Sequence, residues 1–181
     1  MNKNYKGLSY YELIIVIAIM SLMVGFTSIG IGTVYNNNAK RATDKLETSL
    51  KAAKNNAISR GSANGYLNLY YLDGTLYSII GSETDDTFNF STDTRQREII
   101  SNNIDEIYFK YKIGSVNNTL FMTNGTLISI GFKQSTGQLR GFKTPYAGST
   151  VYAKDGFTIV VEKGNTKSVI KVNELGNIQI Q

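Results

Sequence analysis

One acidic residue, Glu12, stands out because it is the only charged residue between Lys6 and Lys40. It lies at the start of an apolar stretch that follows the short basic leader MNKNYKG. A carboxylate in apolar surroundings costs free energy unless it is paired. Cleavage after Gly7 would create an amine on Leu8, and this amine and the carboxylate could each pair with its counterpart on a neighbouring copy. The spacing therefore predicts assembly of several copies.

Composition excludes most catalytic chemistry. The chain of 181 residues has no Cys and no His, so disulfides, Cys-His and Ser-His-Asp catalysis and the commonest zinc ligand are all absent. We therefore expect no enzymatic activity, no cofactor and no metal site. The net charge is +5, and removing Lys3 and Lys6 with the leader leaves +3, which alone is too weak to indicate a nucleic-acid partner.

Charged residues in two parts of the chain could bind a ligand. The acidic segment Ser82–Thr94 carries oxygen ligands that suit calcium, but it lacks the EF-hand spacing, which favours an exposed mobile loop. The basic residues of the second half could form a DNA-binding patch if they gathered on one face, whereas scattered solubilising charges are the simpler interpretation. These residues are Lys133, Arg140, Lys143, Lys163, Lys167 and Lys171.

The segment KGLSYYELIIVIAIM resembles the class III leader and first helix of type IV pilins and type II secretion pseudopilins. In that family a membrane aspartyl peptidase, the prepilin peptidase, cuts after the Gly and methylates the new amino terminus. The resemblance implies cleavage between Gly7 and Leu8, N-methylation of Leu8 and a role for Glu12 in filament assembly. It implies as partners other pilin or pseudopilin subunits, the prepilin peptidase, an inner assembly platform and the membrane.

The uncharged stretch from Leu13 to Ala39 exceeds the ~20 residues that span a bilayer and the 7–15 residues of a secretory signal core. We therefore expect a single-pass membrane protein whose N-terminus is cytoplasmic and whose C-terminal domain lies outside the membrane, in an extracellular or periplasmic filament. A plain membrane anchor would explain the length but would give no reason for Gly7 and Glu12.

Helical periodicity continues past the apolar stretch. Small and medium apolar residues recur at spacings of three and four, and Arg60-Gly61 ends the pattern; the residues are Ala39, Ala42, Leu46, Leu50, Ala53 and Ala57. An unbroken helix from Leu8 to about Ser59 would be ~78 Å long. From Asn64 onward the pattern is typical of strands, with hairpin signals at Asp73-Gly74 and Asn124-Gly125.

The segments KAAKNNAISRGSANGYLNLYY, FKQSTGQLRGF and VNELGNIQIQ are similar to the GspH/FimT branch of minor pilins and pseudopilins. The two resemblances imply an α+β type IV pilin fold, with a long N-terminal helix, membrane-spanning in its first half, packed on antiparallel sheets. The expected organisation is a leader over residues 1–7, a transmembrane or filament-core half of the helix over 8–38, and a soluble domain over 39–181.

We therefore expect a structural subunit, a minor pilin or pseudopilin, of a type IV pilus or a type II secretion filament, processed after Gly7. One alternative is a DNA-binding minor pilin of a competence pilus. FimT-like pilins bind DNA through arginines near the C-terminal strand, and the end GNIQIQ has none, so nucleic acid is the less favoured partner. The other alternative is a membrane-anchored exported domain that does not assemble.

Overall fold

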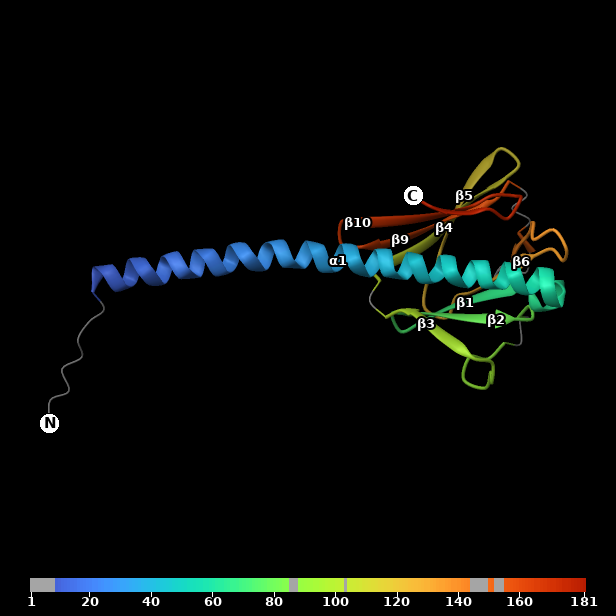
Figure 1. The fold of residues 1–181 in the computed structure, drawn as a ribbon, viewed down its shortest axis with the longest axis horizontal. Coiled ribbons are helices and arrows are strands. Elements are labelled where there is room, and N and C mark those ends of the chain that lie inside the picture. Colours follow the sequence, from blue (N-terminus) through green and yellow to red (C-terminus); the bar gives the residue numbers. More distant parts are fainter. Residues whose placement is uncertain (1–8, 85–87, 103, 144–149, 152–154) are drawn as a thin grey trace.

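The structure is a computed structural model that describes the chain except residues 1–8, 85–87, 103, 144–149 and 152–154, and it describes only the backbone of 25–36 and 150–151. Its dominant element is α1, a helix of 51 residues over Tyr10–Arg60, about 77 Å long at 1.5 Å per residue. Figure 1 shows its first half extending away from the rest of the molecule and its second half lying along the sheets. The helix ends before Gly61, as the sequence predicts, and Gly61 takes a φ of 94°.

The second half of α1 packs through the predicted stripe of apolar residues. Every member of that stripe is at most 1% exposed: Ala39, Ala42, Leu46, Leu50, Ala53 and Ala57. The small side chains let strands approach closely. At Gly65, a Cβ would lie 2.2 Å from the Cβ of Ala57, so only glycine fits where the chain leaves the helix for the first strand.

The strands form two antiparallel sheets, and both contact α1. The short 3-10 helix η1 (Ser62–Asn64) joins α1 to the first of them. The six-stranded sheet has the order β3 (Arg97–Ser101), β2 (Thr75–Gly81), β1 (Tyr66–Leu72), β6 (Leu127–Phe132), β7 (Leu139–Lys143), β8 (Thr150–Val151). The five-stranded sheet has the order β11 (Ile178–Ile180), β10 (Thr166–Val172), β9 (Phe157–Lys163), β4 (Glu106–Ile113), β5 (Val116–Phe121).

One hairpin prediction is confirmed and one is wrong. Asp73-Gly74 joins β1 to β2, which pair along their whole length. Asn124-Gly125 does not make a hairpin, because β5 pairs with β4 and β6 pairs with β1. The turn at Asn124-Gly125 instead carries the chain from one sheet to the other. The Thr126 amide donates to the Thr123 carbonyl across this turn at 2.9 Å.

The core lies between the two sheets and the second half of α1. It contains Leu46 and Leu50 from the helix, Phe132 and Phe142 from the six-stranded sheet, and Phe109 from the five-stranded sheet. The ring centroids of Phe109 and Phe142 are 5.9 Å apart, so aromatic contacts join the two sheets directly.

The predicted fold class is wrong in its membrane-spanning first half. Within the described residues, no helix is both long enough and apolar enough to cross a bilayer. This finding contradicts the predicted single-pass membrane location. It also contradicts the transmembrane role predicted for the described part of residues 8–38.

Candidate assembly site

The projecting first half of α1 exposes an apolar surface on every side. Five consecutive residues, Leu13 to Ile17, are each between 45% and 56% exposed, and at 100° per residue they cover the whole circumference. Five further apolar side chains continue the surface: Ile19, Met20, Leu22, Met23 and Val24. We call these ten residues the apolar helix surface. A helix that is apolar all round is normally buried on all sides, and here the folded domain does not cover it (Figure 1).

The contrast with the second half of the same helix is sharp. There the apolar residues form one stripe, the stripe faces the sheets, and charged residues such as Lys51 and Glu47 pair on the outside at 2.9 Å. That half is a surface helix of a globular domain. The first half lacks a polar face between Leu13 and Val24 apart from Ser21, whose hydroxyl donates to the Ile17 carbonyl at 2.8 Å.

Glu12 lies at the first turn of this helix and belongs to a capping box. The Ser9 amide donates to Glu12 Oε2 at 2.8 Å, and the Glu12 amide donates to Ser9 Oγ at 3.3 Å. These bonds satisfy two amides that the helix itself leaves free, and a carboxylate also suits the positive end of the helix dipole. Sequence reasoning missed the box, although its signal, Ser9 three residues before Glu12, is present.

The capping box leaves Glu12 able to accept another donor. A carboxylate offers about four acceptor positions on two oxygens, and Ser9 uses one of them on Oε2. Glu12 is exposed, so Oε1 can take an ammonium from outside the chain while the cap persists. Gly7 and Leu8, the predicted cleavage and methylation residues, lie outside the described residues.

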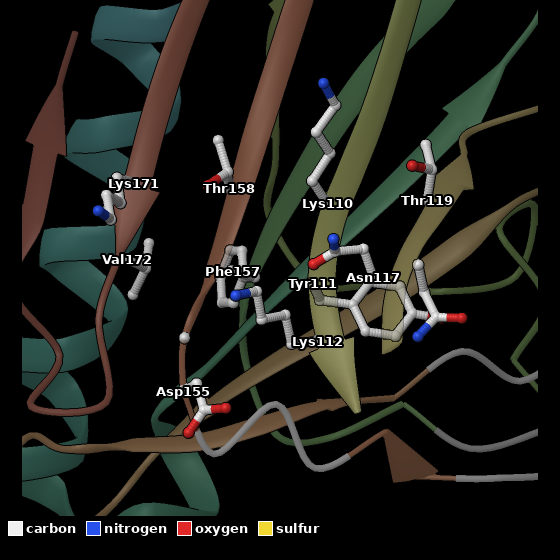
Figure 2. Close-up of a pocket in the computed structure, with 12 residues that line it drawn as sticks. Lys110, Tyr111, Lys112, Asn117, Thr119, Asp155, Phe157, Thr158, Lys171 and Val172 are labelled. Atoms are coloured by element: carbon white, nitrogen blue, oxygen red, sulfur yellow. The ribbon is translucent and has the colours of Figure 1, made fainter. Parts of the chain in front are cut away.

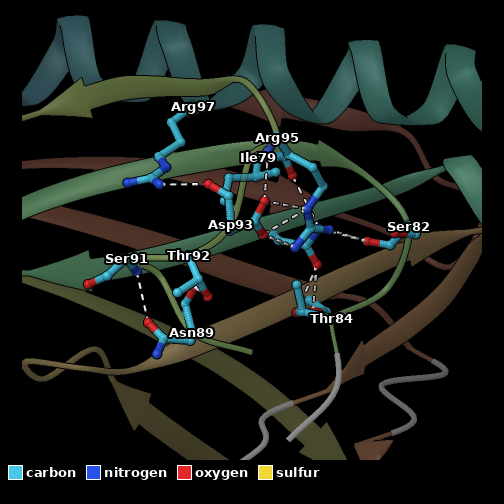
Figure 3. A network of polar contacts seen from close by, with 11 residues as sticks. Ile79, Ser82, Thr84, Asn89, Ser91, Thr92, Asp93, Arg95 and Arg97 are labelled. Carbon is cyan, nitrogen blue, oxygen red and sulfur yellow. Dashed lines mark hydrogen bonds and ion pairs between the residues drawn. The ribbon is translucent and has the colours of Figure 1, made fainter. Parts of the chain in front are cut away.

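An ion pair between Asp93 and Arg95 holds the C-terminal end of the acidic segment Ser82–Thr94 (Figure 3). Asp93 accepts from Arg95 Nε at 2.8 Å on Oδ2 and at 3.1 Å on Oδ1, and the Arg95 Nη2 group also contacts Oδ2. These hydrogen bonds lower the pKa of Asp93 below its usual value, against a smaller opposing effect of burial. Arg95 therefore occupies Asp93, one of the four carboxylates of the segment, and the described residues contain no cluster of three potential metal ligands. Asp85 and Asp86 lie outside the described residues.

The described part of the same segment is a loop and most of its residues are exposed, as predicted, but Thr84 and Phe90 anchor it to the outer side of the six-stranded sheet. Thr84 is only 3% exposed, and the Phe90 ring stacks on Tyr70 with centroids 4.6 Å apart. Arg97 lies over Phe90 at 4.2 Å from the ring centroid. The signal that could have indicated this packing is the pair of aromatic residues, Phe88 and Phe90, inside an otherwise polar segment.

The basic residues considered for DNA binding do not share one face. Arg140 and Lys143 lie on β7 of the six-stranded sheet, whereas Lys163, Lys167 and Lys171 belong to β9 and β10 of the other sheet.

Several of these basic residues are also engaged within the chain. Lys163 pairs with Asp105 and Lys167 with Glu162, each at 2.7 Å, and Arg140 donates to the Tyr66 hydroxyl at 2.8 Å. The described geometry therefore favours solubilising and structural roles for most of the set.

Comparison of the chain with family models, with curated proteins and with solved structures found no match.

Proposed function

We propose that this protein is a structural subunit, a minor pilin or pseudopilin, of a type IV pilus or a type II secretion filament. It has no catalytic role; the prepilin peptidase would remove residues 1–7, and the subunit would then join other copies at an assembly platform. The observation that supports this most strongly is the apolar helix surface, ten exposed apolar side chains on a helix that projects from a folded domain.

The size of this surface explains why a partner is needed. Full burial of one Leu, Ile, Val or Met side chain stabilises by roughly 1.5–3 kcal/mol, and these residues are already about half covered by their own helix. Burying the remainder of ten such side chains is therefore worth on the order of 10 kcal/mol before the costs of association. Because the surface surrounds the helix, several neighbours are required, as in a filament whose helices pack around a common axis.

Glu12 would set the axial position of each subunit in that filament. Helices that are apolar all round can slide past one another at little cost, since Leu, Ile and Val contacts are not directional. A carboxylate among them is costly unless it finds a cation. The methylated amine of a neighbour's Leu8, created by cleavage after Gly7, supplies one, and the Ser9 cap holds the carboxylate in place to receive it.

The experiment compares wild type with Glu12→Ala in cells that produce the filament. Sheared filaments and whole-cell protein are immunoblotted, and the mass of the protein in each fraction is measured. We expect the wild-type mass to correspond to a chain that begins at methylated Leu8. We expect Glu12→Ala to be cleaved normally and to be depleted from the filament fraction, because the neighbour's amine loses its partner.

The matched control is Glu47→Ala, which removes the same functional group from the second half of α1, where Glu47 pairs with Lys51. This variant should enter filaments at the wild-type ratio. Equal ratios for Glu12→Ala and wild type, or a mature protein that still carries Lys3 and Lys6, would contradict the proposal.

A further inference from the structure

The outer face of the five-stranded sheet carries a cup of about 750 Å³. Its walls come from β4, β5, β9 and β10, together with Asp155 and Gly156 just before β9 (Figure 2). The volume falls within the range of ligand sites in proteins. The cup lies on the folded domain, well separated along the chain from the apolar helix surface.

The strand register gathers lysines in this cup. Lys110 on β4 is opposite Thr119 on β5 and Thr158 on β9, and Thr158 is opposite Lys171 on β10. Side chains directly opposite one another lie on the same face of a sheet, so the four residues form one row, Thr119–Lys110–Thr158–Lys171. Lys112 follows two residues after Lys110 on the same face.

The spacing of the three lysines is set by sheet geometry. Lys110 and Lys171 stand two strands apart, about 10 Å, and Lys110 and Lys112 stand about 7 Å apart along β4. These are distances between backbone positions, and the flexible lysine stems can bring the ammonium groups closer or spread them. The arrangement suits a ligand that presents several negative charges along an extended chain.

These lysines differ from the others on the same sheet in making no salt bridge within the described residues. Lys110 is nevertheless one of the charges that lower the pKa of Glu162, after the larger effect of its hydrogen bond from Lys167. Lys163 and Lys167 are each held by a carboxylate at 2.7 Å. Within the described part of the chain, Lys112 and Lys171 make no ion pair, and Lys110 lies over the Tyr108 ring at 5.3 Å. Set against the single carboxylate in the lining, Asp155, the three lysines leave the cup with a positive charge.

The rest of the lining indicates what kind of anion fits. Thr119 and Thr158 offer hydroxyls, and Asn117 offers an amide; such groups exchange hydrogen bonds with sugar hydroxyls.

The rings in the lining are unsuited to stacking on nucleobases, which single-stranded nucleic acids require. Phe157 is 3% exposed, and Tyr111 packs edge-on against Phe142 at 4.9 Å. A lining that offers ammonium and hydroxyl groups but no aromatic ring free to stack favours a negatively charged saccharide over a nucleic acid as the ligand.

We propose that this cup binds an acidic polysaccharide, with Lys110, Lys112 and Lys171 contacting the carboxylates of successive uronate sugars. The threonine and asparagine side chains of the row contact the sugar hydroxyls. The binding is electrostatic in large part, so it weakens as salt is added. It does not depend on assembly, because every residue of the cup belongs to the folded domain of one subunit.

The test uses the full-length chain dispersed in a nonionic detergent and immobilised for interferometry. The probes are polygalacturonate oligomers, neutral dextran of matched size, and oligothymidylate. We expect binding to polygalacturonate at low salt and none to dextran. The double variant Lys110→Gln/Lys171→Gln should raise the Kd for polygalacturonate about tenfold, as expected for two exposed ion pairs that each contribute about threefold.

The matched control is Lys51→Gln/Lys133→Gln, which removes the same net charge from α1 and from the loop after β6. Its Kd should stay within about twofold of wild type, because exposed charges far from the ligand are screened. Equal weakening by both double variants would show that only net charge matters and would overturn the site. Absence of polygalacturonate binding, or tighter binding of oligothymidylate, would overturn the assignment of the ligand.

Discussion

Replacing Asn68 with Ala should cost the folded domain about 3 kcal/mol, mainly through one hydrogen bond that cannot be replaced. Asn68 is fully buried on β1. Its Oδ1 accepts from Ser129 Oγ at 2.7 Å and from Thr84 Oγ1 at 3.2 Å, and its Nδ2 donates to the Ser82 carbonyl at 2.9 Å. The side chain thus holds the start of the acidic segment against the six-stranded sheet.

The magnitude follows from counting protons. The Thr84 Oγ1 and Ser129 Oγ atoms are 2.6 Å apart, so one of the two hydroxyls donates its proton to the other. The hydroxyl that accepts this bond must then donate its own proton to Asn68 Oδ1. In Asn68→Ala that proton is buried without an acceptor, which costs about 1–3 kcal/mol, and the smaller side chain adds a cavity cost of about 1 kcal/mol. The Ser82 carbonyl is spared, because Arg95 Nη1 also donates to it at 3.1 Å.

Thr84→Val is the matched comparison. It removes one hydroxyl and its proton together, and Ser129 can still donate to Asn68, so the expected cost is only about 1 kcal/mol. The assay is urea unfolding of the full-length chain at fixed detergent, followed by the near-ultraviolet circular dichroism of its 12 Tyr residues. A cost of Asn68→Ala below that of Thr84→Val would refute the proton count.

Two further predictions concern the acidic segment. Because the Arg95 hydrogen bonds lower the pKa of Asp93 in the folded state, the ionised carboxylate stabilises the fold above the unfolded value of about 4, and this contribution is lost as the pH falls through the lower folded value. Asp93→Asn should therefore be less stable than wild type at pH 7 and lose less stability between about pH 5 and pH 3; parallel curves would contradict this. Thermal melts of wild type with calcium and with a chelator should coincide, because Arg95 occupies Asp93, and a calcium-dependent rise of several degrees would show a site in the segment.

Local signals in the sequence predicted the helix and the positions of turns well, but they did not predict which strands pair in which sheet. The stripe from Ala39 to Ala57 and the helix end at Arg60 follow from helical periodicity and a glycine, which act within a few residues. Asn124-Gly125 is also a local signal, and the chain does turn there, but which strands pair is decided by contacts between residues far apart in sequence. Asn68, for example, lies 61 residues from its partner Ser129.

The hairpin turn at Gly114-Ser115, between β4 and β5, was not predicted, although a Gly-Ser pair is a hairpin signal.

For the candidate site, the sequence identified Glu12 because it is the only charge in a long apolar stretch, but it did not lead to a prediction of the hydrogen bonds that Glu12 makes. The capping box was readable from Ser9 and Glu12, since its geometry depends only on a spacing of three. The exposure of the surrounding apolar residues could not be predicted in the same way, because an apolar run is equally typical of a buried helix. The basic cup was hidden for a third reason: Lys110 and Lys171 become neighbours only through the register of three strands.

The absence of cysteine from the chain allows a direct test of whether neighbouring subunits cover the apolar helix surface. In Met20→Cys, a single thiol replaces a side chain that is 62% exposed in the isolated chain, and Ser115→Cys places a control thiol in the exposed turn between β4 and β5. A water-soluble maleimide is added to detergent-dispersed subunits and to intact sheared filaments. Burial of the helix in the filament predicts that Cys at position 20 reacts in dispersed subunits and is protected in filaments, while Cys at 115 reacts in both. Equal labelling of position 20 in the two samples would contradict assembly through this helix.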